Sequence, residues 1–145
     1  AELLKELARQ WRPPIYLTKL KKGCHDALPV SLIGPGTIKA MGQMLSMALD
    51  FRRFRPNILM ELDVPFIEES WPGDLLTFGD RGDSAKVRLN RQNARCAITT
   101  VDPDTAARSP QVLKAIVDHR SECLGIYGST EKVGSIRVGD VISLS

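Results

Sequence analysis

The segment NARCAITTVDPDT, residues 93–105, places a cysteine beside an arginine, continues into a β-prone run and ends in a turn rich in Asp and Pro. Residues 97–101 are small or β-branched and predict a half-buried strand. Pro103 has a restricted φ angle, and the Asp and Thr side chains beside it can bond to nearby amides, so the strand is predicted to stop there. Cys96 would then stand directly before a strand, where a rigid element holds its sulfur in place.

Two interpretations of Cys96 are open. Arg95 and Arg91 are close to it in the sequence, and nearby positive charge favours the thiolate form that binds metals and attacks electrophiles. A lone cysteine is, however, most often a small buried hydrophobic residue. Cys96 is therefore a candidate functional residue, and its role depends on the rest of the chain.

The composition indicates one ordinary globular domain. The chain has 145 residues, of which 43% are hydrophobic and 26% charged, enough for a core of its own. No apolar run approaches the roughly 20 residues that span a bilayer, and the charged opening does not resemble a signal peptide. The net charge of +3 is modest, which argues against nucleic-acid binding and is compatible with a small anionic ligand. We expect no membrane and no nucleic acid as partners.

The cysteines indicate a reducing compartment. Cys24, Cys96 and Cys123 are an odd number without a Cys-x-x-Cys pair, which argues against a disulfide scaffold and predicts a cytoplasmic location. A zinc site built from Cys24 and His25 with His119 and Cys123 is a weak alternative, because adjacent residues are poorly placed for tetrahedral ligation. The chain begins with Ala instead of Met, which is consistent with a trimmed chain or a piece of a longer protein.

Short strands outnumber helices along the chain. Helices are predicted over residues 1–11, 38–49 and after Ser109-Pro110. Strands are predicted over residues 15–20, 30–33, 58–62, 75–78, 85–92 and 122–127, with a closing hairpin over residues 133–144. This order predicts a single domain over residues 1–145, with a helical extension over residues 1–14 and a barrel over residues 15–145. The fold class is mainly β with flanking helices (α+β), a small closed or nearly closed β-barrel of about seven strands.

The segment DFRRFRPN, residues 50–57, is the second informative stretch, because its three arginines are interleaved with two aromatic residues before a strand. Pro56 disfavours helical geometry at Arg55 and predicts an extended residue there. In an extended segment, alternation would point some arginines to one side, where planar guanidinium groups can bind phosphate or carboxylate. Asn57 offers both a donor and an acceptor. The alternative is a solvated basic face with aromatic packing.

Two further motifs indicate chemistry only weakly. The adjacent Glu68 and Glu69 could form an acid–base couple, but adjacent side chains on a short segment usually point apart. The tripeptide Arg81-Gly82-Asp83 resembles an integrin ligand. In a protein of a reducing compartment we interpret it as turn chemistry.

Taken in order, these motifs resemble those of the MOSC domain. This is the C-terminal domain of molybdenum cofactor sulfurase, shared with the amidoxime-reducing proteins and many small bacterial proteins. The resemblance runs from about Ile15 to the end of the chain. The motifs that carry it are Gly23-x-x-Asp26-Ala27-x-Pro29-Val30-Ser31-Leu32-Ile33, Arg53-Phe54-Arg55-Pro56-Asn57, Glu68-Glu69-x-Trp71, Arg95-Cys96 with Thr99-Thr100-Val101-Asp102-Pro103-Asp104-Thr105, Gly125-x-Tyr127-Gly128 and Ile136-x-Val138-Gly139-Asp140.

The resemblance implies a β-barrel that holds a molybdopterin-type molybdenum cofactor and does not require pyridoxal phosphate. Cys96 would be the protein thiolate to molybdenum or a sulfur carrier, and soft thiolate suits a sulfur-rich metal centre. Arg55 and Asn57 would contact the pterin or its phosphate. Asp26 would add a polar contact from a facing loop, and Arg95 would favour the thiolate or meet the anionic cofactor. Protein made without a molybdenum supply would lack the cofactor.

The sequence departs in two ways from relatives that reduce N-hydroxylated compounds. Those relatives carry a separate N-terminal β-rich domain with further basic cofactor contacts, for which we expect no room in this chain. They can also place a hydroxyl where Ala94 stands here. We therefore expect a partner or an upstream segment to complete the cofactor site.

Three functions follow, ranked in this order, with the first two close. The first is a molybdenum-dependent oxidoreductase domain that reduces N-hydroxylated or similar small-molecule substrates with electrons from a donor protein. The second is a sulfur carrier that holds a persulfide on Cys96 between a donor and an acceptor protein. The third is a non-catalytic β-barrel that binds an anion or a protein partner, with Cys96 purely structural.

Overall fold

The structure is a computed structural model, and it describes residues 5, 6, 9 and 27–145. The predicted strand over residues 15–20 and most of the predicted helix over residues 1–11 lie outside the described residues. The same holds for Cys24, His25 and Asp26. Among the described residues, no helix is both long and apolar enough to cross a membrane.

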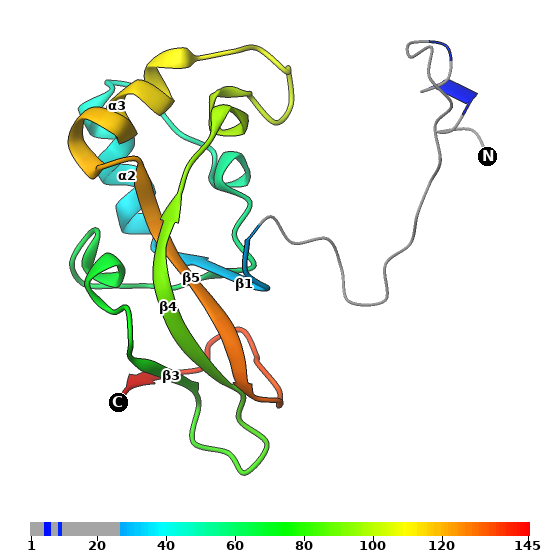
Figure 1. Cartoon of the computed structure of the whole chain (residues 1–145), viewed down its shortest axis with the longest axis vertical. Helices are drawn as coiled ribbons and strands as arrows, with labels where there is room; N and C mark the ends of the chain where they lie inside the picture. Colours follow the sequence, from blue (N-terminus) through cyan, green and yellow to red (C-terminus); the bar gives the residue numbers. More distant parts are fainter. Residues whose placement is uncertain (1–4, 7–8, 10–26) are drawn as a thin grey trace.

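One curled six-stranded sheet organises the described part of the chain and forms a half-barrel (Figure 1). Its strands lie in the order β2-β1-β5-β4-β3-β6, and every neighbouring pair is antiparallel except β1 with β2. The strands are β1 (Val30–Ile33), β2 (Ile58–Leu59), β3 (Leu75–Phe78), β4 (Lys86–Ala94), β5 (Cys123–Lys132) and β6 (Ile142–Leu144). The predicted mainly β fold with flanking helices is confirmed.

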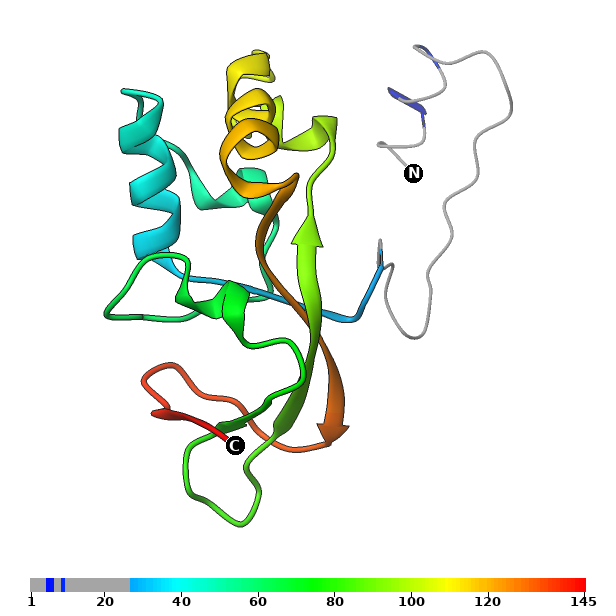
Figure 2. The ribbon, with the colours of Figure 1, turned by 60° about the vertical axis from the view of Figure 1, so that its left-hand side comes forward.

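Helices α2 (Pro35–Met44) and α3 (Pro110–Arg120) pack at one end of the sheet, away from β6 (Figure 2). Each begins with a proline in its first turn, a position where a missing N–H breaks no helical bond. The core has two clusters, one inside the curled sheet around Leu32 and Ile126 and one beneath the helices around Ile33 and Ile116. Because Leu32 and Ile33 are consecutive, strand β1 contributes to both clusters by simple alternation.

The predicted strand over residues 97–101 is wrong, because the 3-10 helix η3 (Ala97–Thr100) occupies this stretch. The hydroxyl of Thr99 donates to the Cys96 carbonyl (3.0 Å) and that of Thr100 donates to the Ala97 carbonyl (2.7 Å). These back-bonds favour a tight turn over a strand. Cys96 therefore follows a strand, β4, and does not precede one.

The extended geometry predicted for Arg55 is also wrong. Residues Phe51–Phe54 form the 3-10 helix η1, capped where the Asp50 carboxylate accepts a bond from the Arg52 amide (2.7 Å). Arg55 ends this helix with φ 49° and ψ 47°, in the left-handed region. Pro56 does exclude right-handed helical geometry at Arg55. The chain satisfies that restriction with a left-handed residue.

Three predicted strands differ in extent. The strand predicted over residues 58–62 is reduced to β2 with two residues, and the predicted closing hairpin contributes only β6. Strand β5 runs five residues beyond the predicted end at Tyr127, because it pairs along the whole of β4.

The two acidic residues of the 3-10 helix η2 (Ile67–Ser70) point apart, as predicted, and both support the fold. Glu68 is fully buried and accepts bonds from the Gly34 amide (3.0 Å) and the Thr37 hydroxyl (3.1 Å) at the start of α2. Glu69 accepts from the Gly125 amide (3.1 Å) and pairs with Arg120. Burial raises the pKa of Glu69.

The tripeptide Arg81-Gly82-Asp83 lies in a turn whose charged side chains are engaged within the protein. Arg81 donates to both carboxylate oxygens of Asp140 (2.5 and 2.9 Å) and to Asp83 (3.2 Å). This bidentate pair ties the turn to the C-terminal segment, in agreement with its interpretation as turn chemistry.

Candidate functional site

A cavity of about 540 Å³ opens where the end of β4 meets η1, η3 and β5. Four of the five predicted site residues lie in its wall, namely Arg55, Asn57, Arg95 and Cys96. The fifth, Asp26, lies outside the described residues. A second cavity of about 700 Å³ beside α2 is larger but mainly apolar, and its wall contains none of the predicted site residues.

Cys96 is an exposed free thiol held on a fixed backbone. It is the N-cap of η3, and its carbonyl accepts from the Thr99 amide (3.2 Å) and the Thr99 hydroxyl (3.0 Å). On its other side the Arg95 amide donates to the Glu122 carbonyl (2.8 Å), which continues the pairing of β4 with β5. The sulfur is therefore accessible while its attachment point is restrained from both sides.

Arg95 directs its guanidinium into the protein. It donates twice to the Leu124 carbonyl (2.8 and 2.6 Å) and once to the Phe54 carbonyl (2.8 Å), and it lies over the Phe54 ring at 5.5 Å. Burial lowers its pKa to about 10, so the group stays protonated at neutral pH. Its hydrogen bonds connect β5 with η1 beside Cys96, a supporting role that the sequence did not suggest.

The side chains of Arg55 and Asn57 differ in the hydrogen bonds that they make within the protein. Arg55 is exposed, and its guanidinium makes no hydrogen bond or ion pair with any residue that the structure describes. Asn57 is anchored to β1, because its amide donates to the Ser31 carbonyl (2.8 Å) and its side-chain oxygen accepts from the Ser31 amide (2.7 Å). No residue that the structure describes accepts a bond from Asn57 Nδ2, which is available as a donor at the cavity.

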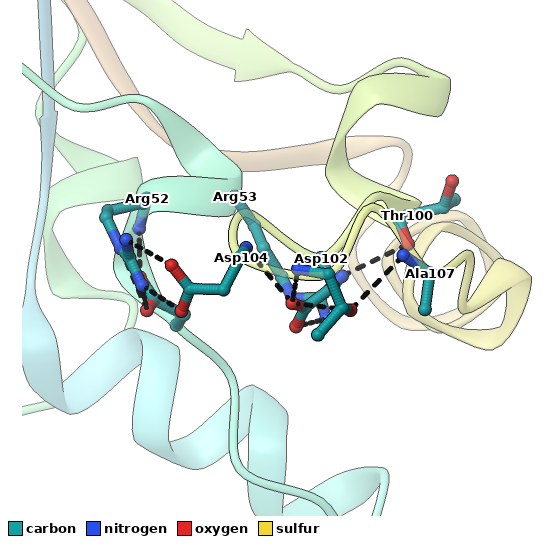
Figure 3. A network of polar contacts seen from close by, with 8 residues as sticks. Arg52, Arg53, Thr100, Asp102, Asp104 and Ala107 are labelled. Atoms are coloured by element: carbon teal, nitrogen blue, oxygen red, sulfur yellow. Dashed lines mark hydrogen bonds and ion pairs between the residues drawn. The ribbon is translucent and has the colours of Figure 1, made fainter.

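Five polar residues of the wall were not selected from the sequence: Ser31, Arg53, Asn93, Thr99 and Tyr127. Asn93 is buried, and its neighbours favour the amide orientation with Oδ1 toward the Arg95 guanidinium (3.2 and 3.3 Å) and Nδ2 toward the Tyr127 hydroxyl (3.2 Å). Arg53 is buried against η3 and the turn that follows (Figure 3). Tyr127 belongs to a motif of the resemblance and Asn93 opens the segment of Cys96, which are the signals that could have identified them.

The donor set suits an anionic ligand that carries its own metal. Within the part of the chain that the structure describes, no group of three or more His, Cys, Asp and Glu side chains could hold a metal ion. The cavity wall instead carries the thiol of Cys96, the guanidinium of Arg55, which pairs with no described residue, and the Nδ2 donor of Asn57. Of the residues considered for zinc, His119 and Cys123 are exposed and partly exposed, while Cys24 and His25 are outside the described residues.

Comparison with known proteins gives relatives of one kind. The chain is 30% identical over 140 residues to mitochondrial amidoxime reducing component 2 of Rattus norvegicus, covering 88% of the chain and 40% of that protein. It is 31% identical over 145 residues to mitochondrial amidoxime-reducing component 1 of Mus musculus, covering 90% of the chain and 40% of that protein. The chain thus spans about two fifths of the length of these curated relatives.

A solved structure and a family model agree with this result. The crystal structure of the YUAD protein from Bacillus subtilis matches with a TM-score of 0.63 at 17% identity, over 80% of this chain and 63% of that one, which shows the fold. The model of the MOSC domain family matches residues 20–143. With nearly the whole chain covered, the protein belongs to the MOSC domain family.

Proposed function

We propose that this domain binds molybdenum cofactor in the 540 Å³ cavity and serves as the cofactor-binding part of an oxidoreductase for N-hydroxylated or similar compounds. The observation that carries the proposal is the presence of an exposed thiol, Cys96, and an exposed guanidinium that pairs with no described residue, Arg55, in one cavity wall. The family and its amidoxime-reducing relatives support the same class of function.

The residues present fit such a group. Ligand cavities of roughly 300–1,000 Å³ are typical for molecules of this size class. A thiolate from Cys96 suits molybdenum as a soft ligand. The exposed guanidinium of Arg55 suits a phosphate, and Nδ2 of Asn57 can donate to an acceptor on the pterin. When bound, the cofactor supplies the redox chemistry, and this chain binds and orients it.

The remaining residues of the wall have supporting roles in this proposal. Arg95 holds β5 and η1 together beside Cys96. Asp26, which lies outside the described residues, is proposed to add a polar contact to the cofactor. Ala94 offers no hydroxyl, so a partner or an upstream segment completes the site. A small-molecule substrate and an electron-donor protein are the expected partners.

Elemental analysis of protein from a host that makes the cofactor tests the proposal. Wild type is expected to hold close to one molybdenum per chain, Cys96→Ala to lose it, and Cys123→Ala to keep it. Cys123 is the matched control because it is a free cysteine outside the cavity wall. Equal molybdenum in wild type and Cys96→Ala, or none in either, would refute the proposed ligand.

Sulfur transport is the second candidate, favoured by the exposure of Cys96. The Cys96 thiolate would attack the outer sulfur of a persulfide on the cysteine of a desulfurase, so that an S–S bond forms on Cys96 while the S–S bond of the desulfurase breaks and its thiolate leaves. Incubation with the desulfurase and free cysteine should then add one sulfur atom to wild type and none to Cys96→Ala, as read by mass spectrometry. Binding of an anion that survives Cys96→Ala but fails in Arg55→Ala would instead favour a non-catalytic binding domain.

A further inference from the structure

The two wall segments that carry Arg55 and Cys96 share no β-ladder. Residues 51–57 form η1 and the turn after it, and residues 95–102 form η3 and its flanks. Both segments fall wholly within the described residues, and each hydrogen bond found between them or to the adjoining turn uses an arginine guanidinium. The distance between Arg55 and Cys96 therefore depends on arginine side chains that connect the two segments.

Arg53 makes the most buried of these connections. Its Nη1 donates to the Thr100 carbonyl (3.1 Å), and its Nη2 donates to Oδ2 of Asp102 (2.7 Å), as Figure 3 shows. The Arg53 side chain is 4% exposed and that of Asp102 is 29% exposed. Removal of Asp102 would leave the buried Arg53 charge without its ion-pair partner, whereas removal of Arg53 would leave the partly exposed Asp102 with its turn bonds alone.

The neighbouring pair of Arg52 with Asp104 has the same chemistry in a different environment. Its contacts are 2.6 and 2.9 Å, but the side chains are 46% and 68% exposed. Exposed ion pairs contribute little, since water screens them and the side chains lose entropy. Asp104 is therefore a natural control for Asp102.

Asp102 uses its two oxygens for different purposes. Oδ1 accepts from the amides of Asp104 (3.1 Å) and Thr105 (2.9 Å) and from the Thr105 hydroxyl (2.9 Å), which shapes its own turn. The bonds from Thr105 and Asp104 hold the pKa of Asp102 below its ordinary value, so the group is ionised at neutral pH. Oδ2 is left to receive Arg53, so one carboxylate joins the turn to η1.

The net contribution of the Arg53–Asp102 pair to stability is expected to be small. The Arg53 Nε atom is buried without a hydrogen-bond partner among the described residues. A buried ion pair with an unsatisfied N–H is weak evidence for stabilisation, because desolvation offsets much of the attraction. A planar guanidinium fork does, however, fix direction more tightly than an apolar contact.

We infer that Arg53 and Asp102 are positioning residues that set the distance between Arg55 and Cys96 across the cavity. Arg55 follows Arg53 by two residues, and its amide closes η1 on the Arg52 carbonyl (3.2 Å), so any rotation of η1 carries Arg55 with it. On the other side, Thr100 ends the short helix that Cys96 begins. The inference rests on the proposed function only in treating this cavity as the ligand site.

Hydrogen exchange in the apo protein tests the connection without any ligand. Asp102→Asn is expected to speed amide exchange in residues 51–57, and Arg53→Lys in residues 97–101, each by about tenfold or more. Asp104→Asn should leave exchange in both segments unchanged. In the double variant, exchange should be only slightly faster than in the more affected single variant, because both changes break the same pair.

Thermal melts confirm that each variant is folded, and Arg53→Lys keeps the charge if Asp102→Asn folds poorly. Acceleration confined to the mutated segment would overturn the inference.

A second measurement asks whether the distance matters for a ligand. Pyrophosphate is used to slow alkylation of Cys96 by iodoacetamide, with the Cys96 peptide followed by mass spectrometry. Asp102→Asn should raise the pyrophosphate concentration needed for protection by about fivefold or more, while the alkylation rate without pyrophosphate is unchanged. Protection equal to that of wild type would overturn the inference. If pyrophosphate fails to protect even wild type, the proposed anion site fails, and the exchange experiment alone still decides the role of Arg53 and Asp102.

Discussion

Replacement of Arg95 by methionine is the sharpest test of how the cavity wall is supported. Methionine keeps an unbranched apolar stem, ends short of the guanidinium position and removes all donors. The carbonyls of Leu124 and Phe54 then lose three hydrogen bonds of 2.6–2.8 Å from a mostly buried cation. The contact of the guanidinium with the Phe54 ring, at 5.5 Å, is lost as well.

The expected magnitude follows from these contacts. Leaving a buried carbonyl without its donor costs roughly 1–3 kcal/mol, and two carbonyls are affected. The cation–π contact adds roughly 0.5–2 kcal/mol. The variant no longer has a charge to desolvate on folding, which offsets part of this destabilisation. We therefore expect Arg95→Met to lower the free energy of unfolding by about 3 kcal/mol, a large share of the roughly 5–15 kcal/mol of a typical domain.

Urea unfolding followed by circular dichroism at pH 7 measures this change. Arg91→Met is the matched control, since Arg91 is exposed on β4, the strand that leads to Arg95, and it should cost less than about 0.5 kcal/mol. Arg95→Lys should fall between the two, because a single ammonium cannot reach both carbonyls as a planar fork does. If Arg95→Met were no more costly than Arg91→Met, the three bonds would not stabilise the wall and the reasoning would be wrong.

Three other changes have definite expected outcomes. Glu68→Gln keeps the shape of a fully buried side chain but cannot accept both bonds at the start of α2, so it should cost about 1–3 kcal/mol in urea unfolding; a negligible change would contradict this. The Arg81 guanidinium lowers the pKa of Asp140 from 3.8 to about 2. The stabilisation from this pair is therefore complete above pH 3.8 and is lost as the pH falls toward 2. Thermal melts of Asp140→Asn should therefore show a shallower acid decline than wild type. Gly125→Ala should cost about 2–4 kcal/mol, because φ is +75° and the added Cβ would lie 2.7 Å from the Leu32 carbonyl; an unchanged denaturation midpoint would count against it.

Elements defined by burial were predictable from sequence. The alternation in β3 and β4 and the helical stripe of α3 report which side chains face the core, and the structure places these elements close to their predicted bounds. Residues 97–100 were mispredicted because local β preference is weak, and the hydroxyls of Thr99 and Thr100 bond back to the main chain. At Arg55 the restriction imposed by Pro56 was predicted correctly, but it allows both extended and left-handed geometry, and the chain adopts the second.

The site was predictable only in part. The resemblance selected Arg55, Asn57, Arg95 and Cys96, which the structure brings to one cavity, and their binding roles stay predictions. Arg53 was not selected because its function depends on Asp102, 49 positions further along the chain. No local pattern distinguishes an arginine that will be buried in such a pair from one that faces solvent, so Arg53 and Arg55 look alike in sequence.

The pairing of β1 with β5 also determines when the cavity can exist during synthesis. Val30 pairs with Gly128, so closing this ladder brings together residues from opposite ends of the described chain. Such closure is slow, because the entropy of a long loop must be lost before the contacts form. Arg95 likewise waits for the Leu124 carbonyl before its side chain can be fixed. On a ribosome, the Cys96 thiol therefore emerges before β5 has been made, and under the proposed function the cofactor can load only after β5 has paired with β1 and β4.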